Sequence, residues 1–96
     1  MTASIGVDRL ITSTPEVCGG RARIDGSRIT VQYIVNEIKA GITPEEIIED
    51  KPYLTLAGIY TALAYYYANK EKLDIAFANY DRECDLLIAE HQTEEL

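Results

Sequence analysis

The chain has 96 residues, of which 47% are hydrophobic and 26% are charged, so it has room for one domain with one small core. A domain of this size buries only about 60 to 65% of its unfolded surface, and we expect a dimer contact or a partner protein to supplement that burial. The formal net charge of −7 excludes a protein that binds nucleic acid over its whole surface, because such binding depends on Lys and Arg that neutralise phosphates.

Cysteine content and hydropathy further limit the kind of protein that this sequence can encode. Cys18 and Cys84 form no CxxC motif, so neither a disulfide framework nor a cysteine metal site is indicated. Residues 1–10 lack the basic and apolar regions of a signal peptide. The uncharged stretch 52–69 contains five tyrosines, whose hydroxyl groups would lack partners in a bilayer. We therefore expect a cytoplasmic protein without a membrane span.

Short strands are predicted in residues 10–30, which form the first part of a single domain 1–96. The candidates are residues 10–12, 22–24 and 27–29. Asp25-Gly26 lies between the last two and suits a two-residue hairpin turn, which needs positive φ.

Three arginines, Arg21, Arg23 and Arg28, surround this turn and form the basic cluster of the sequence. Strand alternation would bring Arg21 and Arg23 onto one face. One interpretation is contact with phosphates, for example in operator DNA. The other is ion pairing with the acidic residues that predominate after residue 30.

Residues 30–69 show the periodicity of three helices. Apolar residues recur with helical spacing from Val31 to Ile38, and Gly41 follows as a C-terminal cap. Thr43 begins a second, short helix with Pro44 and a capping-box glutamate. Thr55 caps a third, uncharged helix, for which we expect a central place in the core with Leu56, Ile59 and Leu63 facing inward.

A fourth helix is predicted over residues 70–92, with Asn69 as its N-cap. Its apolar residues follow a heptad-like spacing, which favours packing against another helix. We call them the heptad stripe: Leu73, Phe77, Tyr80, Cys84 and Leu87. Most other positions of this helix are charged, with an excess of acids. This stripe has two interpretations, an intramolecular core or a binding face for another chain, and we favour the binding face.

A longer series of residues resembles a bacterial family. In chain order it comprises Ile11, Pro15-Glu16-Val17, Gly19-Gly20-Arg21, Ile24, Gly26-Ser27-Arg28-Ile29, Val31, Gly41, Thr43-Pro44-Glu45-Glu46-Ile47, Pro52, Leu54-Thr55 and Ala62-Leu63-Ala64-Tyr65-Tyr66. The series is similar to the antitoxin family catalogued as domain of unknown function 433, from about Ile11 to Leu73. The family usually has proline in place of Ala22 and Thr30, and threonine in place of Ser27.

The resemblance implies a mainly α fold, with a homeodomain-like or winged-helix-like trihelical core after short N-terminal strands, here followed by the extra C-terminal helix. It also implies a PIN-like nuclease toxin as partner. A recognition helix normally offers Arg, Lys, Asn or Gln to base edges, whereas residues 55–68 offer only threonines and tyrosines. This favours a scaffold over direct reading of DNA.

Catalysis is not indicated, because the chain has one histidine, two distant cysteines and no obvious carboxylate pair. We expect neither an enzyme nor a cofactor or metal. The sequence predicts an antitoxin-like homodimer that covers the cleft of a nuclease toxin with its acidic C-terminal helix. The alternative is a DNA-binding autoregulator that uses the trihelical core with Arg21, Arg23 and Arg28.

Overall fold

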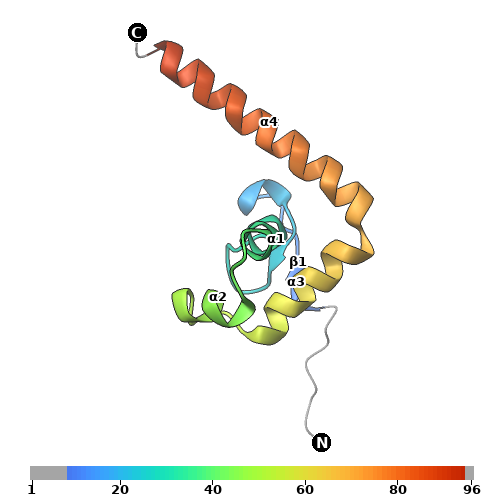
Figure 1. The fold of residues 1–96 in the computed structure, drawn as a ribbon. Coiled ribbons are helices and arrows are strands. Elements are labelled where there is room, and N and C mark those ends of the chain that lie inside the picture. Colours follow the sequence, from blue (N-terminus) through green and yellow to red (C-terminus); the bar gives the residue numbers. More distant parts are fainter. Residues whose placement is uncertain (1–8, 95–96) are drawn as a thin grey trace, which may run out of the picture.

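A computed structural model describes the backbone of residues 9–94 and the side chains of residues 9–89 (Figure 1). In chain order the elements are β1 (Ile11–Thr12), the 3-10 helix η2 (Cys18–Gly20), β2 (Arg23–Ile24), α1 (Val31–Lys39), α2 (Pro44–Asp50), α3 (Leu56–Ala68) and α4 (Lys70–Glu94). The predicted fold class is confirmed: a mainly helical chain with short N-terminal strands and an extra C-terminal helix. The prediction made for residues 1–10 falls mostly outside the described residues.

The hairpin predicted around Asp25-Gly26 is wrong in its second strand. β2 pairs with β1 in antiparallel register, Ile11 opposite Ile24, and residues 27–29 form no strand. The Ser27 hydroxyl donates to the Ile24 carbonyl at 2.8 Å and accepts from the Ile29 N–H at 3.1 Å. The chain nevertheless turns back beside β2, since the Ile24 N–H donates to the Ile29 carbonyl at 2.9 Å and Arg23 and Thr30 form an isolated antiparallel bridge.

The predicted caps Thr43 and Thr55 are confirmed, and Thr30 is a third cap of the same kind, which was not predicted from the sequence. The hydroxyls of Thr30, Thr43 and Thr55 each accept a hydrogen bond from the backbone N–H three residues later, at the start of α1, α2 and α3. Asn69 separates α3 from α4 as predicted, but its side chain donates to the carbonyl of Tyr65 at 3.0 Å. Its side chain therefore caps the end of α3, while its backbone carbonyl accepts a hydrogen bond from the Leu73 N–H at 2.9 Å at the start of α4.

α3 is the central helix and packs against α1, α2 and both strands. Its core-facing side chains are Ile59, Ala62 and Tyr66, all buried. The inward position expected for Leu56 is wrong, since this side chain is exposed. Leu63, seven residues later on the same line of the helix, is half-buried and packs against the core, whereas Leu56 is the first residue of α3 and lies at the end of the helix.

Figure 1 shows α4 leaving the compact part of the fold and extending past it. A helix of 25 residues is about 37 Å long, and only its first half has the body of the protein beside it. Within residues 9–94, no helix combines the length and the hydropathy that a membrane span requires.

Candidate interaction site on helix α4

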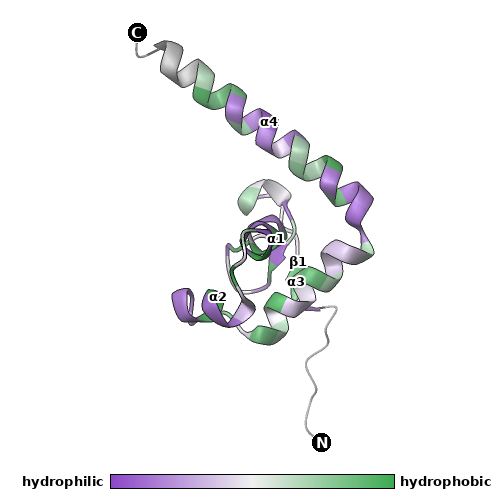
Figure 2. Cartoon of the chain, in the orientation of Figure 1, coloured by the Kyte–Doolittle hydropathy of each residue, from purple (hydrophilic) through white to green (hydrophobic). Residues whose placement is uncertain are grey.

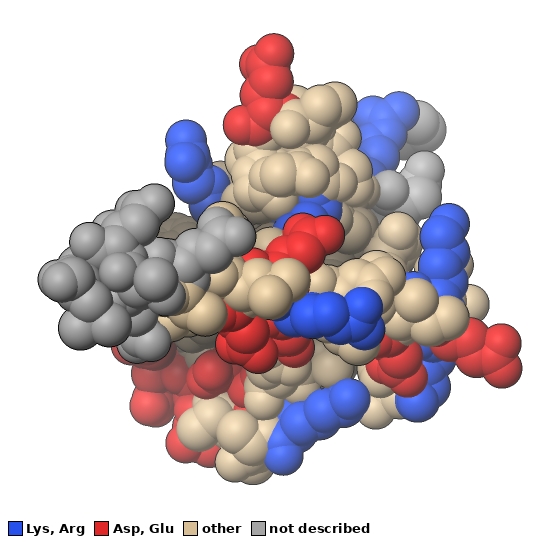
Figure 3. Space-filling view, turned by 90° about the horizontal axis from the view of Figure 1, so that it is seen from above, with Lys and Arg blue, Asp and Glu red and all other residues tan. Residues whose placement is uncertain are grey.

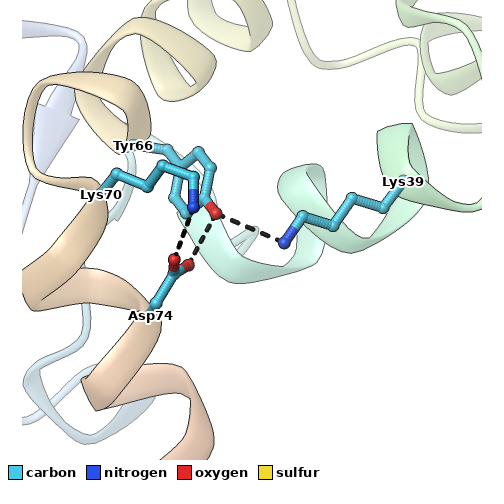
Figure 4. Close-up of polar contacts among 4 residues, drawn as sticks. All are labelled: Lys39, Tyr66, Lys70 and Asp74. Carbon is cyan, nitrogen blue, oxygen red and sulfur yellow. Dashed lines mark hydrogen bonds and ion pairs between the residues drawn. The ribbon is translucent and has the colours of Figure 1, made fainter.

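A polar cluster fixes the start of α4 to the body (Figure 4). The hydroxyl of the buried Tyr66 donates to Asp74 Oδ1 at 2.6 Å and accepts from Lys39 Nζ at 3.3 Å. Lys70 Nζ lies 2.9 Å from Asp74 Oδ2. The hydrogen bonds from Lys70 and then from Tyr66 lower the pKa of the Asp74 carboxyl, and the same ion pair raises the pKa of Lys70. This cluster joins α1, α3 and α4.

An aromatic contact continues the attachment one turn further along α4. The rings of Tyr66 and Phe77 are stacked, with centroids 5.8 Å apart and planes 8° apart. Leu73 and Phe77 are half-buried and pack against the core of their own chain. The first two residues of the heptad stripe therefore belong to the intramolecular core and not to a binding face.

Tyr80 and Asp81 make the next attachment. The guanidinium carbon of Arg21 lies 3.5 Å from the centroid of the Tyr80 ring, a cation–π contact. Gln32, which is buried, accepts a hydrogen bond from Arg21 and donates to Asp81 Oδ1 at 2.9 Å. Contact with the Cys84 thiol raises the pKa of Tyr80, against the lowering effect of Arg21.

A groove of about 460 Å³ lies between this part of α4 and the body. Ala22 and Val31 line it on the body side, and Leu73, Phe77 and Tyr80 line it on α4. The groove is a gap in the packing of α4 against its own chain, and the first three residues of the heptad stripe form its apolar lining on α4.

Glu83 still lines the groove, and beyond it the stripe continues without the body beside it. Cys84 is half-buried. Viewed down the helix axis, Leu87 and Ile88 lie on either side of Cys84, on the same face of α4. Leu87 is 64% exposed and Ile88 is similarly open. We call Cys84, Leu87 and Ile88 the distal stripe. The heptad spacing missed Ile88, although its position four residues after Cys84 was a usable signal.

Charge surrounds the distal stripe. On the helical wheel Asp81 and Asp85 lie along one edge of it and Glu83 along the other, with Arg82 on the far side. All four side chains are exposed. The second half of α4 thus carries an apolar line between acidic edges.

The three arginines of the N-terminal part do not act as one cluster. Arg23 Nε donates to the Ser27 carbonyl at 3.0 Å and its Nη1 donates to Thr14 Oγ1 at 3.1 Å, whereas Arg21 turns to Gln32 and Tyr80. The one-face arrangement predicted from strand alternation is therefore wrong, because β2 begins only at Arg23. Arg28 is exposed.

Figure 3 shows Lys and Arg as separate groups on the face viewed from above, with no continuous basic patch. The ion pairs of the described residues join Lys51 to Asp50 and Lys70 to Asp74, so the interpretation of the arginines as ion-pair partners of the acidic helices is not supported for Arg21 and Arg23. DNA binding through these residues stays a prediction. Among the described residues no group of three His, Cys, Asp or Glu side chains could hold a metal ion.

Fold and site together define a small, mainly helical domain with an acidic, partly uncovered C-terminal helix. The chain belongs to the family described as "Protein of unknown function (DUF433)", whose pattern matches residues 11–66. It is similar to the crystal structure of a DUF433 member protein from Anabaena variabilis, with 36% sequence identity and a TM-score of 0.68 over 75% of this chain and 71% of that chain. The comparison with curated proteins gives no match. The family match ends within α3, so the distal stripe lies outside it.

Proposed function

We propose that this protein is an antitoxin-like binding module that neutralises a nuclease toxin of the PIN-like type by laying the second half of α4 over the toxin's cleft. The observation that carries the proposal is the distal stripe, an apolar line that its own chain leaves uncovered between acidic edges. A helix with such a face suits a groove that has an apolar floor.

Charge favours a nuclease as the occupant of this face. An enzyme that binds RNA needs a basic cleft, because it must neutralise phosphates. Glu83 and Asp85 would meet the rim of such a cleft, beside Asp81, which already accepts a hydrogen bond from Gln32, while Leu87 and Ile88 fill its floor. Complementary charge speeds the encounter, and an occupied cleft excludes RNA.

The attachments of the first half of α4 support the same function. The Tyr66–Asp74 hydrogen bond, the Tyr66–Phe77 stack and the Arg21–Tyr80 contact hold the base of the helix against the body. A helix that is already ordered loses less conformational entropy on binding than a free segment does. The distal stripe is therefore presented in a form that is ready to bind.

The test is co-expression of the chain with the product of the adjoining reading frame, followed by size-exclusion chromatography and an RNase assay on the complex. Wild type and Leu86→Glu are expected to form an inactive complex. Leu87→Glu should lose the complex and release RNase activity, because it places a charge within the apolar line. Retained inhibition by a folded Leu87→Glu protein, or equal loss in both variants, would contradict the proposal.

A further inference from the structure

A second exposed apolar line runs along α3, on the side that faces away from the core. It comprises Leu56, Tyr60, Ala64 and Tyr67, all exposed, and we call it the α3 stripe. Their spacing of four, four and three residues places them on one face of the helix. Tyr60 is 52% and Tyr67 is 66% exposed. Figure 2 shows α3 in green and pale colours, in contrast to the purple segments of α4.

The α3 stripe lies in the longest uncharged part of the chain. Residues 52–69 contain no Asp, Glu, Lys or Arg, although 26% of all residues are charged. The core does not explain this, because Ile59, Ala62 and Tyr66 already fill the inward side of the helix. A contiguous apolar face on a charged protein marks an interaction surface.

We infer that the α3 stripe binds a second copy of this chain and forms a twofold-symmetric dimer. In such a contact the same patch meets itself, so a charged residue near the axis would face its own like charge. Two chains that each carry a net charge of −7 repel each other, and a face that lacks charge adds no local repulsion where they meet. The α3 stripe provides this face, and the acidic edges of the distal stripe do not.

The shape of the α3 stripe fits an antiparallel pair of α3 helices. In that arrangement Leu56 of one copy lies opposite Tyr67 of the other, and Tyr60 lies opposite Ala64. A large side chain thus meets a small one at the centre, which is how packed helices interdigitate. The tyrosine hydroxyls can remain hydrated at the rim of the contact.

This contact does not rest on the proposed function, because it is measured on the purified chain alone. The α3 stripe faces away from the core, whereas the distal stripe continues the core-facing side of α4. Binding of a second copy and binding of a nuclease therefore use different surfaces. A dimer would carry two α4 helices.

The test is sedimentation equilibrium of the wild type, Tyr60→Glu, Tyr60→Lys and an equal mixture of the two variants. We expect a wild-type dimer and a dissociation constant raised at least ~100-fold in each variant alone, because the two like charges are buried about one helical turn apart across the twofold axis. The mixture should restore a one-to-one dimer. Tyr65→Glu is the matched control, since Tyr65 lies on the opposite side of α3 and is also exposed.

Circular dichroism checks that each variant is folded, and the pair Tyr67→Glu and Tyr67→Lys replaces the Tyr60 pair if those variants unfold. A wild-type monomer at the highest soluble concentration would overturn the inference. So would an unchanged dimer in the folded Tyr60 variants. Loss of the nuclease complex in Tyr60→Glu, with the wild type monomeric, would instead assign the α3 stripe to the nuclease and would also overturn it.

Discussion

Replacing Leu87 by alanine tests the distal stripe at its most exposed member. The side chain is 64% exposed in the free chain and makes little contribution to the core, so the free energy of unfolding should stay within about 0.5 kcal/mol of the wild type. In the complex with the nuclease, we expect Leu87 to be buried.

The expected loss of binding free energy follows from the part of the Leu87 side chain that is still exposed in the free chain. Complete burial of a leucine side chain is worth about 1.5 to 3 kcal/mol. About two thirds of that is available at Leu87, so Leu87→Ala should weaken binding by about 1 to 2 kcal/mol. This corresponds to a dissociation constant about 5- to 30-fold higher, which isothermal titration calorimetry resolves.

Leu86→Ala is the matched control for this measurement. The two leucines are neighbours, with Leu86 59% and Leu87 64% exposed, and they differ in direction by about 100°. Leu86 lies outside the distal stripe, so its replacement should change the dissociation constant less than about 2-fold. Equal effects of the two substitutions, or none from Leu87→Ala, would refute the assignment of the stripe as the binding face.

Three further predictions concern the attachment of α4 and the core. Ile59→Ala leaves a cavity at a completely buried position and should lower the free energy of unfolding by about 2 to 5 kcal/mol in urea denaturation. Asp74 has a lowered pKa in the folded chain, so its contribution to the free energy of unfolding is present above pH ~4 and is lost as the pH falls through the folded-state pKa. In an acid titration followed by circular dichroism, Asp74→Asn should not show this pH-dependent loss of stability. Arg21→Ala removes the contact on Tyr80, and amide hydrogen exchange around residue 80 should become faster while exchange of the α3 core is unchanged.

Local chemistry in the sequence determined where the helices begin. Thr30, Thr43 and Thr55 each cap a backbone N–H only three residues away, so the signal and the structure that it forms lie in the same short segment. The stripe on α4 was predictable for the same reason, because a heptad spacing is read along one helix. Because consecutive residues of a helix differ in direction by about 100°, Tyr65, Tyr66 and Tyr67 could not all face the core, and the structure buries Tyr66 and exposes the other two.

Only the tertiary structure decided which half of that stripe is covered. Phe77 meets Tyr66 because Asn69 directs α4 back along the body, and Leu87 remains open because the body ends before α4 does. The partners of Arg21 were likewise outside the reach of a local pattern, since Tyr80 lies 59 residues further along the chain. Burial and long-range contacts depend on which distant segments come together in space. The spacing of residues within one segment does not determine which distant segments those are.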